Sequence, residues 1–320
     1  MRVSMRPKIS FAPLFALSAL SFATSLVINI NLPPIPGPPS QSQPNPIWQQ
    51  YGPLDITATI NSTVVVIPIP LADARARIPA QYGILSAAYH ELLPGWPVDK
   101  YPLIIAVQLE HDIRTGLGVG VPDFTTFRVA FPFVDILNDG FSNFVYAPVN
   151  WINANLVGLL GLSTYGLFTP PAILDPPSDP YAFVPPSQAS AAGEVYFTFT
   201  DIDVLNVNTI TPPNGYVKLA PAAPEVPWNF IRNITNQPFT GNFLLCDNQI
   251  RIFNTSLTKP PFDPTPVAGR VFLDSKLYPG LKLDRNDAKG WLFAAAFKEN
   301  NFLPCPVYKG YRGTGSGDSL

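Results

Sequence analysis

The stretch Tyr101–Gly118, YPLIIAVQLEHDIRTGLG, decides the fold of this chain. Its first part predicts a β-strand over residues 102–110, because side chains alternate between the two faces of a strand. One face is wholly apolar and consists of Leu103, Ile105, Val107 and Leu109. The other face changes from apolar to polar and consists of Ile104, Ala106, Gln108 and Glu110. Such a face either meets solvent or lines a cavity, and the alternation of residues does not distinguish these two environments.

Further elements follow directly in the chain. Residues 124–137, FTTFRVAFPFVDIL, and 141–151, FSNFVYAPVNW, are strand-like. The almost continuous apolar run from Phe127 to Ile136 is typical of a strand covered on both faces, with Pro132 at a bulge or an edge. Residues 151–166 predict a helix with apolar positions three and four apart. The residues that share this spacing are Ile152, Leu156, Leu159, Leu160 and Ser163.

The rest of the chain is also rich in strand patterns. Residues 55–71 predict two short strands around a turn at Asn61–Ser62, and residues 72–83 predict a short helix that ends at Pro79. Residues 287–301, DAKGWLFAAAFKENN, predict a second longer helix, and residues 170–186 predict an irregular proline-rich loop. Three further strands are expected within residues 193–206, 248–257 and 269–278.

Composition narrows the class of protein. With 320 residues and 47% hydrophobic content, the chain can bury a large core. Only 13% of residues are charged and the net charge is -2, which argues against a nucleic-acid partner. The 39 prolines disfavour long helices. We therefore expect one β-rich domain over residues 54–308, followed by a disordered tail over residues 309–320.

The N-terminal residues predict a targeting segment. Three basic residues precede an apolar run from Phe11 to Phe22, and small residues follow, so residues 1–23 are interpreted as a secretory signal peptide. An uncleaved membrane anchor is the alternative, since the apolar run extends to Ile28. Residues 24–53 are proline-rich and predict an extended tether. The mature protein is expected in the secretory pathway or outside the cell, without a membrane partner.

Two other features agree with that compartment. Glycosylation acceptor triplets begin at Asn61, Asn233 and Asn254. The pair Cys246 and Cys305 is most simply a disulfide in a secreted chain, and two buried free thiols are the alternative. This disulfide would stabilise the fold by roughly 4 kcal/mol on the chain-entropy model.

The central region resembles the acetoacetate decarboxylase superfamily. Members have a strand that ends in a His-Asp turn followed by Gly-Leu-Gly, and here His111-Asp112 precedes Gly116-Leu117-Gly118. The segments 72–83 and Thr164–Phe168 are similar to two further motifs of that superfamily, so the resemblance covers roughly residues 60–175. It implies an α+β, β-rich fold: a closed, cone-like antiparallel β-barrel with a few peripheral helices and an apolar pocket.

The resemblance does not extend to the chemistry of that superfamily. Its decarboxylases use a lysine that forms a Schiff base, and the matching turn here reads Leu167-Phe168, without an amine. The substrate-binding arginine of the family falls near Pro68–Ile69, and its two pocket carboxylates fall near Ala106 and Pro122. A Schiff-base decarboxylase is therefore not expected.

Strand parity suggests which residues could act in such a pocket. If Ala106 faces the cavity, Gln108 and Glu110 face it too, and Glu110 becomes the best general acid/base candidate because burial raises the pKa of a carboxylate. The competing interpretation is that Glu110 ends a strand near solvent. Weaker candidates are Asp123 with Arg128, which could equally form an ordinary ion pair, and Tyr165, which could be a core residue.

Three functions follow from this reading. The first is a secreted enzyme of fungal secondary metabolism that uses acid/base chemistry on a small keto- or polyketide-like compound. The second is a binding protein for an apolar small molecule, and the third is a structural protein with a filled barrel. No cofactor or metal is expected, because the two histidines, His90 and His111, lie without neighbouring cysteines. The sequence allows a homo-oligomer and does not determine the oligomeric state.

Overall fold

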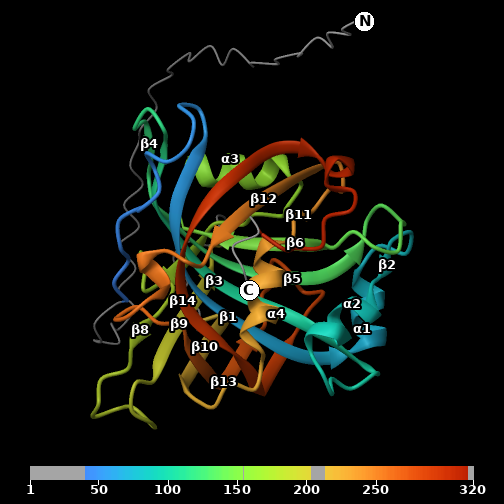
Figure 1. Ribbon diagram of the computed structural model, residues 1–320. Helices are drawn as coiled ribbons and strands as arrows, with labels where there is room; N and C mark the ends of the chain where they lie inside the picture. The colour runs from blue at the N-terminus through green and yellow to red at the C-terminus, as the bar shows by residue number, and fades with distance from the viewer. Residues whose placement is uncertain (1–39, 154, 203–212, 316–320) are drawn as a thin grey trace, which may run out of the picture. The chain divides into compact units, whose positions relative to one another are not determined.

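The computed structural model describes residues 40–153, 155–202 and 213–315, and the predicted signal peptide lies outside them. Seven strands of the main sheet close into a barrel, because the first and last of them, β1 and β14, pair along Ile56–Val66 (Figure 1). In order around the barrel they are β1 (Ile56–Pro70), β3 (Lys100–Thr115), β5 (Phe124–Asp135), β6 (Phe144–Ile152), β11 (Phe239–Thr240), β12 (Leu245–Ile252) and β14 (Leu283–Pro304). Only β6 and β11 run parallel among these neighbours. The expected closed barrel is confirmed, with one parallel pair in it.

A second set of strands explains why the barrel wall is apolar on both faces. It extends from β14 in the order β13 (Thr265–Leu273), β10 (Gly215–Pro221), β9 (Val195–Asp201) and β7 (Ala172–Asp175). The Phe199 ring of β9 lies 4.6 Å from the rings of both Phe127 and Trp151, measured between ring centroids. Every residue of β5 is buried, because its other face points into the barrel. The bulge expected at Pro132 is present, since the β5–β6 register shifts between Phe131 and Val134.

Short elements complete the chain. Minor strands are β2 (Gly83–Ile84), β4 (Gly120–Val121) and β8 (Ala182–Phe183), and the helices are α1 (Leu71–Arg77), α2 (Ser86–Leu92), α3 (Leu156–Thr164), α4 (Trp228–Asn236), η1 (Ser256–Thr258) and η2 (Cys305–Tyr308). The predicted short helix before Pro79 is confirmed as α1. Residues of α3 and of α4 line two different cavities of the barrel. In the described part of the chain, no helix has the length and apolarity needed to cross a bilayer.

The helix predicted over residues 287–301 is wrong, because this segment lies inside the 22-residue strand β14. Its alanine-rich sequence favours a helix locally. In the fold, however, β14 pairs with β1 along one edge and with β13 and then β12 along the other. The small residues suit this crowded position, since Gly290 lies directly beside the backbone of β1. Tertiary pairing therefore overrides helix propensity.

The structure also bears on the predicted turn at Asn61–Ser62 and on the predicted glycosylation sites. No turn forms at Asn61–Ser62, because β1 continues through both residues. The Asn61 amide is buried and donates to Ser40 and Ser42, so the folded protein has no room for a glycan there. Asn254 is exposed, and its glycosylation stays a prediction, as does that of Asn233 in α4.

The helix expected over residues 151–166 starts only at Leu156, and two of its apolar positions are exposed. The side chain of Asn155 accepts a hydrogen bond from the Gly158 amide and caps the helix, while Trp151 and Ile152 belong to β6. Leu156 and Leu160 are exposed at 70% and 57%. The buried positions of α3 are instead Gly158 and Leu162.

The chain is ordered further toward its ends than predicted. The tether prediction is wrong from Ser40 onward, because Ile47 packs in a small apolar cluster and Asn45 donates to Asp112. The tail prediction is wrong up to residue 315, since the backbone oxygen of Arg312 accepts a hydrogen bond from the Asn143 side chain. Residues 170–186 contain the short strands β7 and β8 rather than only a loop.

Candidate active site

The barrel interior holds two cavities that share one side chain, Gln249. The first, here called the acid cavity, has a volume of about 180 Å³ and lies between α3 and the strand ends. Its polar lining comprises Glu110, Tyr165, Asp247, Gln249, Glu299 and Asn301. Its apolar lining includes Ile113, Val121, Phe124, Val157 and Leu162. It is therefore an apolar pocket with three carboxyl groups in its wall.

Glu110 is placed in this wall by the alternation of β3. The residue is 5% exposed, and its Oε1 accepts a hydrogen bond of 3.0 Å from Nε2 of Gln249 on β12. Burial raises the pKa of Glu110, whereas the Gln249 hydrogen bond and the charges of Arg128 and Arg251 lower it. The net effect is a raised pKa for a buried carboxyl group at a largely apolar pocket, which is the setting of a general acid/base.

The other two carboxyl groups interact with each other. Burial raises the pKa of Asp247 well above its usual range, and the Glu299 carboxylate beside it raises that pKa further. Burial also raises the pKa of Glu299 to about 7, and Glu110 adds to this effect. A hydrogen bond between the two side chains favours the proton on Asp247. The pair therefore holds at least one proton at neutral pH, which it can donate.

A hydrogen-bond chain links this pair to α3. Nδ2 of Asn301 donates to Oε2 of Glu299 over 2.9 Å, and the Tyr165 hydroxyl donates to Oδ1 of Asn301 over 2.7 Å. The Tyr165 ring stacks on Phe302 with a centroid distance of 5.5 Å. Burial raises the pKa of Tyr165, so its hydroxyl stays protonated and acts as a donor. These contacts orient Glu299 toward the cavity.

The second cavity, here called the arginine cavity, has a volume of about 40 Å³. Arg128 of β5 and Arg251 of β12 line it, and both are at least 94% buried. The Arg128 guanidinium lies 4.1 Å from the centroid of the Phe239 ring, and its Nε donates to Asn150. Burial lowers the pKa of both arginines, that of Arg251 to about 9.

Four of the five residues proposed from the sequence lie at these cavities. Glu110 and Tyr165 line the acid cavity, and Gln108 and Arg128 line the arginine cavity. The expected orientation of the strand over residues 102–110 is therefore confirmed. The competing interpretation, in which Glu110 ends a strand near solvent, is wrong because β3 continues to Thr115.

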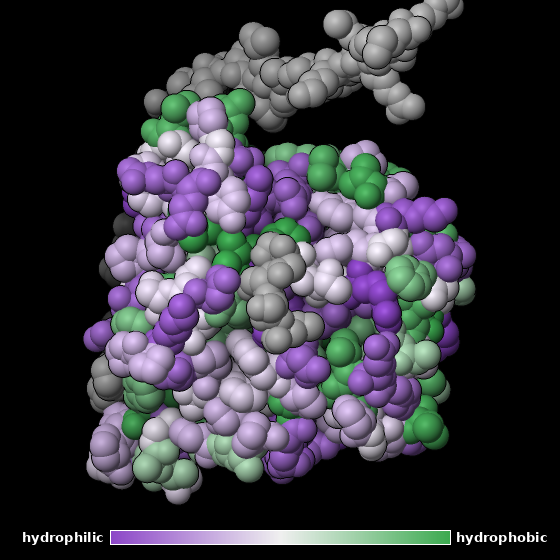
Figure 2. Space-filling model, viewed as in Figure 1, coloured by the Kyte–Doolittle hydropathy of each residue, from purple (hydrophilic) through white to green (hydrophobic). Residues whose placement is uncertain are grey.

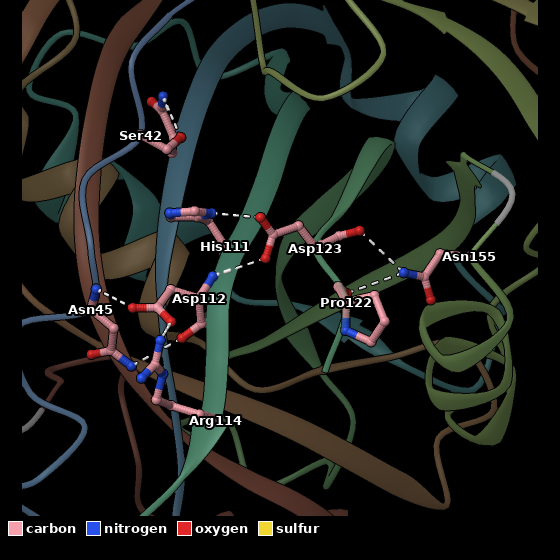
Figure 3. Close-up of polar contacts among 9 residues, drawn as sticks. Ser42, Asn45, His111, Asp112, Arg114, Pro122, Asp123 and Asn155 are labelled. Carbon is pink, nitrogen blue, oxygen red and sulfur yellow. Dashed lines mark hydrogen bonds and ion pairs between the residues drawn. The ribbon is translucent and has the colours of Figure 1, made fainter. Parts of the chain in front are cut away.

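The fifth residue, Asp123, lies elsewhere (Figure 3). Its Oδ2 is 2.6 Å from Nδ1 of His111, its Oδ1 accepts from the Asp112 amide, and its side chain is 44% exposed. It therefore pairs with His111 and not with Arg128. Asp123 lies in the short connection between β4 and β5. Because β4 pairs with the end of β3, this connection places Asp123 beside His111 and not in the barrel.

Several solved structures match this fold. The enduracididine biosynthesis enzyme MppR with HEPES buffer bound matches with a TM-score of 0.48 at 9% identity, over 80% of this chain and 89% of that chain. The acetoacetate decarboxylase-like enzyme from Sphingomonas wittichii RW1 matches with a TM-score of 0.45 at 8% identity, over 79% and 94%. Acetoacetate decarboxylase from Legionella pneumophila matches with a TM-score of 0.42 at 10% identity, over 91% and 100%.

This chain is similar to acetoacetate decarboxylase-like enzymes. No protein-family model matches the chain, and no curated protein matches its sequence. The turn at Leu167-Phe168 contributes no amine, and the described residues that line the two cavities include no lysine. Lys218, on β10, pairs instead with Glu194 over 3.3 Å.

Sequence reasoning missed four residues of the site: Asp247, Gln249, Arg251 and Glu299. The first three alternate along β12, so parity applied to that strand would have placed them on one face. Glu299 was missed because its segment was interpreted as a helix. In the structure Gln249 pairs directly with Glu299 across β12 and β14.

Glu299 makes the stability of the protein depend on pH. The pKa of Glu299 is about 7 in the folded state and 4.5 in its ordinary state, so the folded protein binds this proton more tightly. The contribution to stability is complete below pH 4.5 and is lost as the pH rises through 7. We expect wild type to lose about 2 kcal/mol over this range and Glu299→Gln to lose much less. Urea unfolding at several pH values measures this.

Glu91→Gln is the matched control, because Glu91 is exposed and pairs with Arg312 at the surface. This variant should keep the pH profile of wild type. Identical profiles for Glu299→Gln and wild type would contradict the assignment of the proton to Glu299.

Proposed function

We propose that this protein is an acid/base enzyme acting on a small, largely apolar carbonyl compound in the acid cavity, without an imine intermediate. The observation that carries the proposal is the placement of Glu110, Asp247 and Glu299 in the wall of one apolar pocket. One carboxyl group can then accept a proton while another donates one into the same space, which general acid/base catalysis requires. The reaction class is proton transfer next to a carbonyl, as in an isomerase, hydratase or cyclase.

The roles follow from the hydrogen bonds of the three carboxyl groups. Ionised Glu110, held by Gln249, takes a proton from the carbon next to the carbonyl. The protonated Asp247–Glu299 pair donates a proton to the carbonyl oxygen, so that an enol forms without net change of charge on the substrate. In a substrate with a double bond between the β- and γ-carbons, Glu110 then returns its proton to the γ-carbon while the enol hydroxyl returns its proton to the Asp247–Glu299 pair, which completes an isomerisation. Asn301 and Tyr165 position Glu299 and do not exchange protons.

The rim of the cavity supports an apolar substrate. Val157 of α3 lines the cavity and is 51% exposed, next to the exposed Leu156 and Leu160. Figure 2 shows several hydrophobic residues near the upper edge of this face, in the same half of the molecule in which Figure 1 places α3. An apolar molecule can therefore approach along α3 before it reaches the carboxyl groups.

We further propose that the protein works in the secretory pathway or outside the cell. The pairing of Cys246 with Cys305 supports this, because disulfides persist mainly in oxidising compartments. Both sulfur atoms belong to fully buried residues, so the bond is structural rather than exchangeable at the surface.

The test is hydrogen exchange catalysed by the purified protein. 2-Pentanone and cyclohexanone in deuterated water are followed by proton NMR, which reports deuterium uptake next to the carbonyl. We expect wild type to accelerate uptake and Glu110→Gln to lower the rate by about 10²-fold or more. Glu225→Gln is the control, because Glu225 pairs with Lys289 outside the acid cavity, and it should keep the wild-type rate.

A binding protein for an apolar small molecule is the second candidate, favoured by the apolar lining of the same cavity. It predicts that both ketones bind, as seen by saturation-transfer NMR, without any deuterium uptake above the uncatalysed rate. Uptake that is equal in wild type and Glu110→Gln would remove Glu110 from the mechanism. If the ketones neither bind nor take up deuterium, both functions are excluded for these compounds.

A further inference from the structure

The charges inside the barrel are separated by sign. The residues that line the acid cavity include three carboxyl groups and no arginine, whereas those that line the arginine cavity include Arg128 and Arg251 and no carboxyl group. Gln249 stands between the two, and its amide is directed to Glu110. No acid lines the arginine cavity itself; Glu110 and Asp247, in the wall of the acid cavity, act on Arg128 and Arg251 through their charge.

The guanidinium groups also have unused donors. Within residues 40–153, 155–202 and 213–315, Nη2 of Arg128 and both Nε and Nη1 of Arg251 have no hydrogen-bond partner. Both side chains are more than nine-tenths buried, so bulk water does not solvate them. Leaving a buried charged donor unpaired is costly, and a bound ligand that accepts these hydrogen bonds would recover that cost.

The remaining lining suits a small ligand with negative charge. Gln108 lines the cavity and is buried, so its side-chain amide can add a neutral donor. Gln237 is already engaged, since its Oε1 accepts from the Phe133 amide and its Nε2 donates to Asn233. The other walls are apolar and include Ile104, Val145 and Phe239. A cation finds no charged partner in this cavity.

Size limits the ligand further. A cavity that holds one buried water has a volume of roughly 10–15 Å³, and the arginine cavity has a volume of about 40 Å³. This admits one small monovalent anion and excludes anions with several carbon atoms. We propose that the arginine cavity is a binding site for a small monovalent anion of the size of chloride or bromide, held by Arg128, Arg251 and Gln108. The site is distinct from the acid cavity, and its occupation does not depend on the proposed reaction.

The first arm of the test measures thermal unfolding of wild type in 0.2 M sodium chloride and in sodium gluconate at equal ionic strength. Gluconate is too large for the cavity. An anion that binds only the folded state raises the Tm, and we expect chloride to raise it by about 2 °C or more relative to gluconate. Arg251→Gln should lose this difference. Arg270→Gln, which removes an exposed arginine paired with Asp284, should keep it.

The second arm uses wild-type crystals grown in sodium bromide, so it does not depend on whether Arg251→Gln folds. Anomalous diffraction at the bromine edge should show one peak in contact with both guanidinium groups. A cavity that contains only water overturns the proposal. So does a chloride effect of equal size in Arg251→Gln, which would mean a general salt effect. Bromide in the crystal without any Tm difference in 0.2 M chloride would mean an adventitious ion only and would also overturn it.

Discussion

Gly290→Ala is expected to destabilise the protein by at least about 3 kcal/mol, because the added carbon has no space in the barrel wall. A Cβ atom at this position would lie 1.9 Å from the Val64 carbonyl oxygen and 2.7 Å from the Val65 Cα. Both are backbone atoms of β1, so no side chain can move to make room. Gly290 pairs with Val65 on one side and with Val267 on the other, so the strands that close and extend the barrel would both shift.

The measurement is urea unfolding followed by circular dichroism. Gly280→Ala is the matched control, since an added Cβ there meets nothing within 4 Å and the residue is exposed. Its free energy of unfolding should stay within about 0.5 kcal/mol of wild type. A Gly290→Ala variant with wild-type stability would contradict the close contact between β14 and β1.

Removal of the disulfide is expected to cost about 4 kcal/mol. Cys246 and Cys305 are bonded, with 5.0 Å between their Cα atoms, and the sequence separation is 59 residues. The bond joins the start of β12 to η2, just after β14 ends, and so constrains two neighbouring strands of the barrel. On the chain-entropy model the loss comes from greater freedom of the unfolded chain.

This effect is measured by comparing wild type with the double variant Cys246→Ala/Cys305→Ala in urea. Reductant should shift wild type toward the stability of the variant and leave the variant unchanged. The two free thiols should appear in unfolded wild type only after reduction. Thiols that react before reduction would contradict the disulfide.

Part of the candidate site was accessible from sequence because it depends on strand parity alone. Gln108 and Glu110 share a face of any strand that includes both, so a cavity on that face receives both side chains. Tyr165 and Arg128 were also located at the cavities, although their actual partners, Asn301 and Asn150, were not foreseen. Those partners lie 136 and 22 residues away in the chain.

The errors have physical causes. Residues 287–301 have a composition that favours a helix in isolation, but strands on both edges give their backbone groups partners in the sheet. That error concealed Glu299 and with it the carboxyl pair. Asp123 was assigned to the pocket because it lies beside Pro122, where the resemblance to the superfamily put a pocket carboxylate, and its contact with His111 places it outside.

The sequence by itself determined that the protein is β-rich, that Gln108 and Glu110 share one face of a strand, and that Cys246 and Cys305 are available to pair. These properties follow from composition and alternation over a few residues. Only the tertiary structure decided that β14 closes the barrel against β1, and that carboxyl and guanidinium groups occupy separate cavities. Both depend on contacts across long separations, such as the 139 residues between Glu110 and Gln249, which no local pattern specifies.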